Sequence, residues 1–291
     1  MTAKLRKITG FDCFNVFWML LFAIFCLIPL LIMFSGSFST DSALQTYGFT
    51  LFPKEWSLLS YGIVFKDGLV LLRAYGISIL VTAAGTALSI VLTALIAFPL
   101  SRNDFKFKNP ITILILITML FSPGLVPTYI LITQYLKWRN SLLALIVPGL
   151  GGSFYIILMR TFFADVPKEI SDSAKIDGCS NFGIFLRIIM PLSTPALATC
   201  AVLFSLNYWN DWYSSFLYIE SRELWSVQYL MIKLANEAQA WKMNASLSTG
   251  VESADSVVMA TCIVGSLPVM IVFMFLQKYI VKGMMVGAVK G

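Results

Sequence analysis

Six long apolar stretches without a charged side chain limit, more than any other feature, how this chain can fold. A helix needs ~20 consecutive apolar residues to cross a bilayer. The uncharged stretches cover 14–34, 74–101, 111–136, 141–159, 192–210 and 256–277. Charged residues make up 12% of the sequence, against about 25% in soluble domains. The sequence therefore predicts an all-α membrane protein with one transmembrane domain over 1–291, its six spans at about 14–35, 74–100, 111–136, 141–162, 192–218 and 256–278.

Prolines lie inside two of these stretches, Pro123 and Pro127 in the third and Pro268 in the sixth. In lipid, a proline inside a span is tolerated where neighbouring groups bond the backbone carbonyls that it frees. We therefore expect the spans to pack against one another as a bundle.

The first stretch could also be a cleaved signal peptide, because Lys4, Arg6 and Lys7 precede it and small residues follow it at 35–37. Its apolar run has 21 residues, which is longer than the usual ~7–15 residues of a signal peptide. We expect it to be retained as the first span.

The positions of the basic residues predict the orientation, since short inner loops carry an excess of Lys and Arg. With the amino terminus inside, 13 of the 21 basic residues fall on the inner side and 8 on the outer side. Six spans then place both termini in the cytoplasm. This asymmetry accounts for the net charge of +6, so we expect lipid around the chain and no nucleic-acid partner.

Several kinds of chemistry have no candidate residues in this sequence. It contains no histidine, which is the commonest general base and metal ligand. The five cysteines are expected in or near spans or on the inner side, so no disulfide framework is implied. No Gly-x-x-x-x-Gly-Lys-[Ser/Thr] loop for ATP phosphates occurs. We expect no catalytic residue, no metal site and no cofactor in this chain, which is therefore not expected to be an enzyme.

A polar segment of helical composition, 164–191, separates the fourth and fifth spans. Pro167 is expected in the first turn of a short helix, with Asp165 near enough to cap it. One face of this helix then contains the positions i, i+3, i+4 and i+7, which are Ile170, Ser173, Ala174 and Asp177. Gly178 is expected to end it in the left-handed conformation.

A second short helix is expected after this glycine. Ser180 can cap it, and its apolar stripe contains Phe182, Phe185, Leu186 and Ile189. Pro191 and Pro195 should end it where the chain re-enters the membrane. Helical spacing leaves two interpretations open, a docking surface for a soluble protein or an ordinary amphipathic helix at the membrane surface.

The segment resembles the Glu-Ala-Ala motif of ABC-importer permeases, which continues with three residues, Gly, nine residues and Ile-x-Leu-Pro. Asp172-Ser173-Ala174 takes the first three places, Gly178 the glycine, and 188–191 (Ile-Ile-Met-Pro) the close, with every spacing kept. Asp replaces Glu, Ser replaces Ala and Met replaces Leu, and each replacement keeps the charge sign, the small size or the apolar character. Asp177, before the glycine, matches the form found in sugar importers.

Other segments resemble the same group of proteins. Residues 121–129, 209–212 and 283–291 are similar to signatures of carbohydrate permeases of the maltose-importer type. Residues 53–57 with Tyr61, and residues 227–230, resemble the branch that imports oligosaccharides derived from complex polysaccharides.

The resemblance implies a permease subunit that forms half of the translocation pathway for an oligosaccharide or a polysaccharide-derived sugar. The implied partners are a second, different permease, two copies of a cytoplasmic ABC ATPase that bind ATP and Mg²⁺, and an external sugar-binding protein. The implied location is the bacterial cytoplasmic (inner) membrane. The ATPase-coupling residues would be Glu169, Asp172, Ser173, Ala174, Asp177 and Gly178.

Two alternatives remain, a secondary transporter and an ABC permease for a solute other than a sugar. A secondary transporter would need ionisable residues at mid-span, and none of the six stretches supplies one.

The candidate substrate-path residues follow the fifth apolar stretch. Asn207, Tyr208, Trp209, Asn210 and Asp211 offer the aromatic faces and polar groups that commonly hold sugars. Asp211 lies 20 residues past Pro191, roughly 30 Å along a helix, which places it near the outer interface. Trp and Tyr are also ordinary residues of the interfacial aromatic belt, so both interpretations stay open.

Overall fold

The computed structural model describes residues 10–121, 123–245 and 254–288. Within these ranges the regular structure is helical, apart from an isolated bridge between Ser39 and Trp56. The all-α prediction is therefore confirmed for the described part of the chain. The expectations placed on Lys4, Arg6, Lys7, Ser122 and residues 289–291 fall outside it. The chain forms two compact units, residues 1–68 with 231–266 and residues 69–230 with 267–291.

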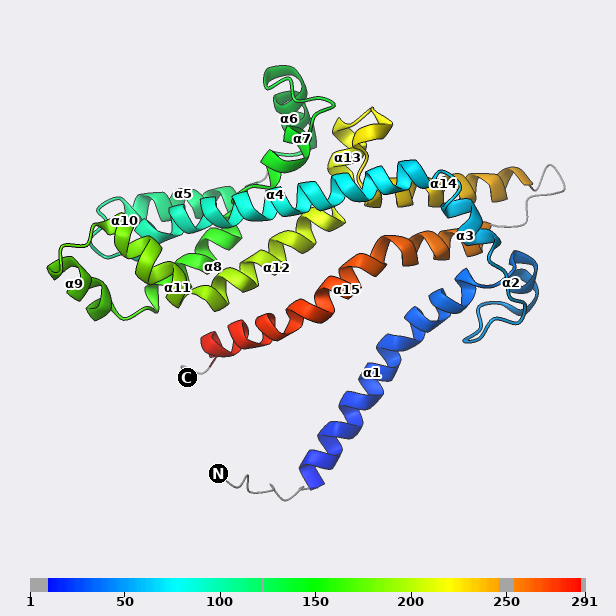
Figure 1. Cartoon of the computed structure of the whole chain (residues 1–291), viewed down its shortest axis with the longest axis horizontal. Coiled ribbons are helices and arrows are strands. Elements are labelled where there is room, and N and C mark those ends of the chain that lie inside the picture. Colours follow the sequence, from blue (N-terminus) through cyan, green and yellow to red (C-terminus); the bar gives the residue numbers. More distant parts are fainter. Residues whose placement is uncertain (1–9, 122, 246–253, 289–291) are drawn as a thin grey trace. The chain divides into compact units, whose positions relative to one another are not determined.

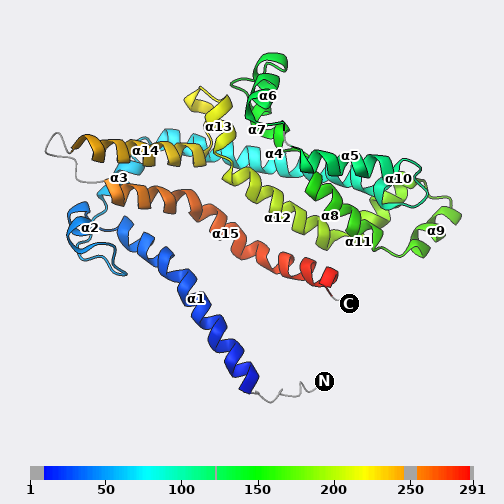
Figure 2. The same ribbon diagram turned by 180° about the vertical axis from the view of Figure 1, so that it is seen from behind.

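The larger unit is built around three helices that lie side by side (Figures 1 and 2). They are α4 (Gly68–Ser101), α8 (Ser153–Ala164) and α12 (Thr194–Asn210). One buried apolar cluster joins them to the segment between α8 and α12, and it contains Ala94, Ala97, Met159, Phe163, Ile184, Phe185, Ile189, Ala196, Cys200 and Phe204. This cluster fixes the position of the segment that carries the Glu-Ala-Ala-like string.

Only α4 and α1 (Gly10–Ser37) are single described helices that are long and apolar enough to cross a membrane. Three further expected spans are bent pairs of helices. In the third expected span, α5 (Lys108–Leu120) is followed by α6 (Leu125–Ile130) and a π-helical turn (Leu131–Tyr135). The two parts of this span meet at a bend of 109°. In the fourth expected span, α7 (Leu142–Ile146) continues as a 3₁₀ turn (Val147–Gly149) and is followed by α8. The bend between these two parts is 49°. Counting each bent pair as one span gives up to five.

The third bent pair joins the segment after α9 to α12. Residues Asn181–Leu192, which include α10 (Asn181–Ile184), a π-helical turn (Phe185–Ile189) and α11 (Met190–Leu192), meet α12 at 79°. The helical segment continues through Pro191 to Leu192 and breaks at Ser193, so the prediction that Pro191 ends it is wrong. Pro195 lies in the first turn of α12, directly after this break. In the third span, Pro123 precedes Gly124, whose φ of 85° suits glycine. The prolines therefore mark two of the breaks.

The turn between α6 and α7 is bonded to the segment after α13 (Tyr213–Tyr218). The Asn140 amide N–H donates to the Tyr218 carbonyl at 2.8 Å. The Asn140 side-chain oxygen accepts from the N–H groups of Glu220 and Ser221 at 3.2 and 3.0 Å. These three bonds make α6, α7 and α13 one local module of the larger unit, set to one side of α4 (Figure 1).

The smaller unit contains α1, α2 (Asp41–Tyr47), α3 (Leu59–Val64) and parts of α14 (Val227–Ala245) and α15 (Ala254–Ala288). The Asp41 carboxylate accepts from the Ser256 amide N–H at 3.1 Å, which ties the start of α2 to the start of α15. In α1, the most apolar 18-residue window has no buried residue. Its side chains are therefore free to face lipid or another protein.

Candidate coupling surface and substrate path

The Glu-Ala-Ala-like string forms α9 (Lys168–Ile176), which is held at its carboxyl end by the backbone. The N–H of Gly178 bonds the Lys175 carbonyl at 3.0 Å, and the N–H of Cys179 bonds the Ala174 carbonyl at 2.9 Å. This pair of bonds is the Schellman motif, which needs a left-handed residue, and Gly178 has a φ of 82°. The Ser180 hydroxyl accepts from the Gly183 N–H at 3.1 Å and caps α10. Both local expectations are confirmed.

The amino end of α9 differs from the expectation. Pro167 stands at the N-cap position, and no side chain bonds the free N–H groups there. Asp165 instead ends α8, because its backbone continues the turn from that helix. The prediction that Asp165 caps α9 is therefore wrong.

Most side chains of α9 are exposed. Ser171 is buried, and Ala174 packs partly buried against the apolar cluster. The other predicted coupling residues, Glu169, Asp172, Ser173, Asp177 and Gly178, are exposed. Ile176, which is not among the predicted coupling residues, is 88% exposed. An isoleucine at the end of a polar helix was the signal that could have marked it as a contact residue.

The stripe expected on the second helix divides into two parts. Phe185 and Ile189 are buried in the apolar cluster, whereas Phe182 and Leu186 are exposed. The π-helical turn at Phe185–Ile189 has a longer hydrogen-bond repeat, so residues spaced for an α-helix no longer share one face. The prediction of a single stripe is wrong for Phe182 and Leu186. These two side chains, with Ile176, give this end of the unit an exposed apolar surface.

An ion pair joins α9 to the turn after α4. Lys175 Nζ lies 2.9 Å from Asp104 Oδ2, and Arg102 Nε lies 3.3 Å from Asp104 Oδ1. The hydrogen bond from Lys175, with further help from Arg102, lowers the pKa of Asp104 below its usual value despite partial burial. The carboxylate is therefore ionised at neutral pH. A polar cavity of about 280 Å³ lies beside the pair, and Asp172 and Ser171 contribute to its wall.

Arg160 makes a second link at the same end of the unit. Its Nε donates to the Leu100 carbonyl at 3.1 Å, which joins α8 to the last turn of α4. A cation near the carboxyl end of a helix also interacts favourably with the helix dipole. Helices α8 and α9 are thus both connected to the end of α4 or to the turn after it.

Tyr208 is held inside the fold. Its hydroxyl donates to the Ile146 carbonyl at 2.9 Å and lies 3.2 Å from the Ser89 hydroxyl. Its ring lies so close to Gly85 and Gly149 that a Cβ on either glycine would come within 2.6 and 3.0 Å of it. The side chain therefore joins α12 to α4 and to the end of α7.

The other substrate-path candidates occupy different faces of α12 and its end. Trp209 is buried, with 8% of its surface exposed. Asn207 and Asn210 are exposed at i and i+3, so their amides share one face of the helix. Asp211 is half-buried, and its carboxylate accepts from the Ser214 N–H at 3.0 Å. The structure thus brings Asn207 and Asn210 together on an open face and separates them from Tyr208 and Trp209.

Within residues 10–121, 123–245 and 254–288, no group of three or more His, Cys, Asp or Glu side chains is placed to hold a metal ion.

Known proteins resemble this chain over almost its whole length. The polygalacturonan/rhamnogalacturonan transport system permease protein YtcP of Bacillus subtilis (strain 168) is 34% identical over 283 residues, covering 97% of this chain and 98% of that protein. The chain belongs to the permease subunits of carbohydrate ABC transporters. The arabinooligosaccharides transport system permease protein AraQ of the same strain is 30% identical over 281 residues, with 95% of each protein covered.

Solved structures agree with this family. A crystal structure of a bacterial ABC transporter that imports the acidic polysaccharide alginate contains a chain that matches the permease with a TM-score of 0.79. That chain is 25% identical, and the match covers 96% of this chain and 99% of the other. A chain of an alginate ABC transporter in complex with an alginate pentasaccharide-bound periplasmic protein has the same fold, with a TM-score of 0.56, 11% identity and 90% and 92% coverage. No family model matches the sequence.

Membership of this family makes the chain a transport protein rather than an enzyme. Its relatives are permeases that stand in membranes, and α1 and α4 have the length and composition of membrane spans. The permease is therefore an integral membrane protein of a carbohydrate transport system.

Proposed function

We propose that this permease forms half of the pathway through which an ATP-driven importer takes up polysaccharide-derived oligosaccharides. The names of its relatives support this substrate class, since these relatives are permeases of transport systems for polygalacturonan/rhamnogalacturonan and arabinooligosaccharides. The proposal includes six spans in one transmembrane domain over 1–291, both termini in the cytoplasm, and a bacterial cytoplasmic membrane. The 13 basic residues on the expected inner side support that orientation.

The partners belong to the same proposal. A second, different permease completes the pathway, two copies of a cytoplasmic ABC ATPase bind ATP and Mg²⁺, and an external binding protein delivers the sugar. The periplasmic protein bound to the related alginate transporter supports the last of these. We expect no cofactor in this chain, because the ATPase subunits supply the hydrolysis.

The observation that supports the coupling proposal is the exposure of the α9 side chains. A backbone cap at Gly178 defines the carboxyl end of this helix, and almost all of its side chains are exposed. Exposed Ile176, Phe182 and Leu186 add apolar area of the kind that marks a protein interaction site. In this proposal the ATPase grips α9 through Glu169, Asp172, Ser173 and Asp177, while Ala174 and Gly178 keep it seated on the permease.

The expected motion follows from the contacts behind α9. When the two ATPase subunits close, they pull α9 along with them. Ala174 and the buried residues after α9 transmit this movement to α4, α8 and α12, which share the apolar cluster. The spans then rock toward an outward-open state. Sugar passes the exposed amides of Asn207 and Asn210, at the far end of α12.

Two variants test the coupling role in the complete transporter reconstituted in vesicles with its binding protein. Asp172→Lys reverses an exposed charge, and like charges brought together at an interface cost several kcal/mol, so we expect sugar uptake to fall about tenfold or more. Ala174→Trp overfills the contact with the apolar cluster and pushes α9 outward, with a similar loss. In both variants, basal ATP hydrolysis should persist and lose its response to sugar-loaded binding protein.

The matched control is Lys106→Glu, a charge reversal on an exposed residue of the turn between α4 and α5, outside α9. It should leave uptake and stimulated hydrolysis close to those of the unaltered transporter. Normal coupled uptake by Asp172→Lys and Ala174→Trp would show that the ATPase binds elsewhere.

A further inference from the structure

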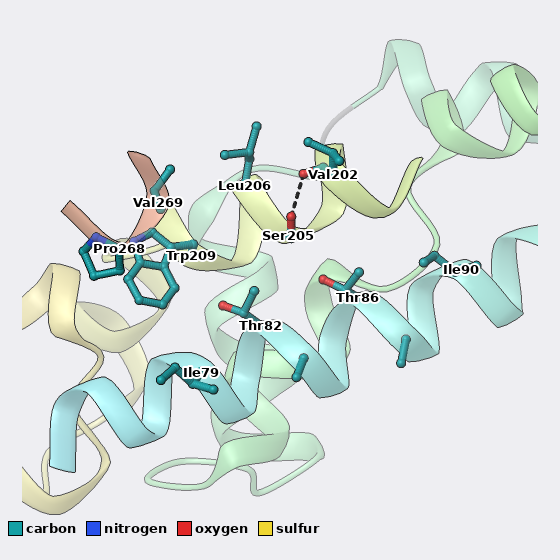
Figure 3. A pocket seen from close by; sticks show the side chains of 12 residues that line it. Ile79, Thr82, Thr86, Ile90, Val202, Ser205, Leu206, Trp209, Pro268 and Val269 are labelled. Atoms are coloured by element: carbon teal, nitrogen blue, oxygen red, sulfur yellow. Dashed lines mark hydrogen bonds between the residues drawn. The ribbon is translucent and has the colours of Figure 1, made fainter. Parts of the chain in front are cut away.

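The larger unit contains an apolar groove of about 450 Å³ that the coupling proposal does not use (Figure 3). Helix α4 supplies six wall residues at helical spacing, and α12 and the second part of α15 supply the rest. The wall residues are Ile79, Thr82, Ala83, Thr86, Ala87, Ile90, Val202, Ser205, Leu206, Trp209, Pro268 and Val269. The α4 residues form one stripe in which small side chains stand between two isoleucines.

Three polar atoms in this wall have no partner. The indole Nε1 of Trp209 and the hydroxyls of Thr82 and Thr86 are buried, and none finds a hydrogen bond among the residues that the structure describes. Trp209 as a whole is 8% exposed. A buried donor left without an acceptor costs about 1–3 kcal/mol. The groove is therefore incomplete without an occupant that brings acceptors.

Ser205, by contrast, satisfies its hydroxyl within its own helix. It lines the same groove, and its hydroxyl donates to the Val202 carbonyl one turn back at 2.8 Å (Figure 3). Thr199, in the same helix, donates to the Pro195 carbonyl at 2.9 Å. Hydroxyls in spans commonly make such bonds to their own helix. An indole N–H has no such route, so Trp209 in particular requires an acceptor from outside.

The chemistry of the wall separates three classes of occupant. A lipid chain would fill an apolar groove, but its methylenes accept no hydrogen bond. A sugar carries oxygen atoms on every side, and burying hydroxyls without partners against isoleucine, valine and alanine is costly. A transmembrane helix meets both demands. Small residues allow two helix backbones to approach closely, and single polar residues bond across such interfaces.

We propose that this groove binds a transmembrane helix of the second permease, with a side-chain oxygen that accepts from Trp209. The proposal rests on the proposed function, because it requires a transporter with two different permeases. The small side chains of one stripe on α4 allow the backbone of the bound helix to approach closely. This stripe contains Thr82, Ala83, Thr86 and Ala87. This assigns Trp209 to the subunit interface and leaves Asn207 and Asn210 as the substrate-path candidates of α12.

The first helix of this chain is a weaker occupant by the same criterion. Between Asn15 and Ser35, α1 has no side chain that carries oxygen. It could fill the groove but would offer no side-chain acceptor to Trp209.

The test uses a photo-crosslinking residue in the complete transporter. Benzoylphenylalanine replaces Ala83 or Ala87 in the groove, and Leu88 or Val91 on the exposed remainder of α4 in the controls. After irradiation in native membranes, mass spectrometry identifies the attached peptide. We expect a transmembrane peptide of the second permease from positions 83 and 87, at least about tenfold above positions 88 and 91.

The other outcomes of this crosslinking experiment distinguish failure of the groove proposal from failure of the proposed function. Attachment to lipid, to sugar or to a peptide of this same chain would overturn the groove assignment while leaving the importer proposal intact. Failure of any second permease to co-purify with the active transporter would instead contradict the proposed function itself.

A substitution at Trp209 gives an independent measurement. Trp209→Phe keeps an aromatic ring in the groove and removes the N–H, so the variant should fold and lose only the bond to the partner. One hydrogen bond of about 1 kcal/mol corresponds to about fivefold weaker association of the two permeases. Trp18→Phe, in the exposed wall of α1, is the matched control and should leave association unchanged. Equal association in both variants would contradict an acceptor for Trp209.

Discussion

The segment around α9 and the carboxyl end of α12 belong to one continuous stretch of chain, but their side chains are held differently. In α9 the backbone makes the fixing contacts, through the Schellman motif at Gly178 and the cap at Ser180, and most side chains stay exposed. At the end of α12, Tyr208 is buried and bonded to two other helices. Side chains committed to the fold are not available to a ligand, so substitutions in the two regions should have different consequences.

The largest expected effect comes from Tyr208. Tyr208→Ala removes a ring packed on Gly85 and Gly149 and leaves a cavity, which for large aromatic residues costs about 3–5 kcal/mol of stability. Tyr208→Phe keeps the ring and loses the bonds to Ile146 and Ser89, at about 1 kcal/mol. Thermal unfolding of the purified transporter, followed by its tryptophan fluorescence, measures both. An unchanged unfolding temperature with a raised KM for sugar would instead make Tyr208 a ligand.

The second largest effect is expected at the end of α9 and should reduce the coupling of ATP hydrolysis to sugar transport. Gly178→Val places a branched side chain at a φ of 82°, where backbone strain costs about 1–3 kcal/mol. No atom lies within 4 Å of the new Cβ, so the strain is in the backbone alone. We expect the end of α9 to shift and sugar-stimulated ATP hydrolysis to fall several-fold.

Gly178→Asn is the matched control, because asparagine tolerates the left-handed conformation better than other residues. It should retain most of the stimulated hydrolysis. Equal activity of the valine and asparagine variants would show that the geometry of this turn does not matter to coupling.

The third effect distinguishes the two faces of α12. Asn207→Ala and Asn210→Ala remove exposed amides, so the free energy of unfolding should change by no more than about 0.5 kcal/mol. Each lost hydrogen bond to a sugar hydroxyl should raise the KM for uptake by about fivefold. If these residues only face the membrane interface, neither variant changes the KM. Measuring uptake against sugar concentration in vesicles separates the two cases.

Local features of the segment around α9 could be predicted from the sequence, and contacts between distant residues could not. Gly178 and Ser180 have short-range geometric roles that residue type alone indicates. The pair between Lys175 and Asp104 joins residues 71 apart, and the bonds of Tyr208 reach across 62 and 119 positions. No rule based on residue spacing predicts contacts between residues so far apart in the sequence. The carboxyl end of α12 was therefore predicted as a set of residues, without the division between buried and exposed faces.

The spans show the same limit. Hydropathy located the apolar segments, and prolines indicated where some helices break, but neither gives an angle. The structure shows bends of 109°, 49° and 79° within these spans. A π-helical turn at Phe185–Ile189 also changed which residues of the second helix face the core. Helical periodicity assumes a regular repeat, so it placed Phe182 and Leu186 on the wrong side.

The smallest effect concerns the ion pair behind α9. Lys175 and Asp104 are both partly exposed, and such pairs contribute about 0–1 kcal/mol. Lys175→Met should therefore reduce coupled uptake by less than about fivefold, since one kcal/mol corresponds to that factor. The double variant Asp104→Lys with Lys175→Asp restores opposite charges across the gap and should recover part of the loss. Lys106→Met, on the same turn but with no ion pair among the described residues, controls for the loss of a positive charge.

The pH dependence of coupling gives this pair a separate test. The pKa of Asp104 is lowered in the folded protein, chiefly by the hydrogen bond from Lys175. A lowered carboxyl pKa contributes stability above the unfolded value of about 3.9, and that contribution disappears as the pH falls through the folded value. The pair therefore stays intact from about pH 5 to 8, and Lys175→Met should reduce coupling by the same factor throughout that range. A deficit that grows as the pH falls from 8 to 5 would mean that a group other than Asp104 titrates, and the link between α9 and the end of α4 would need a different partner.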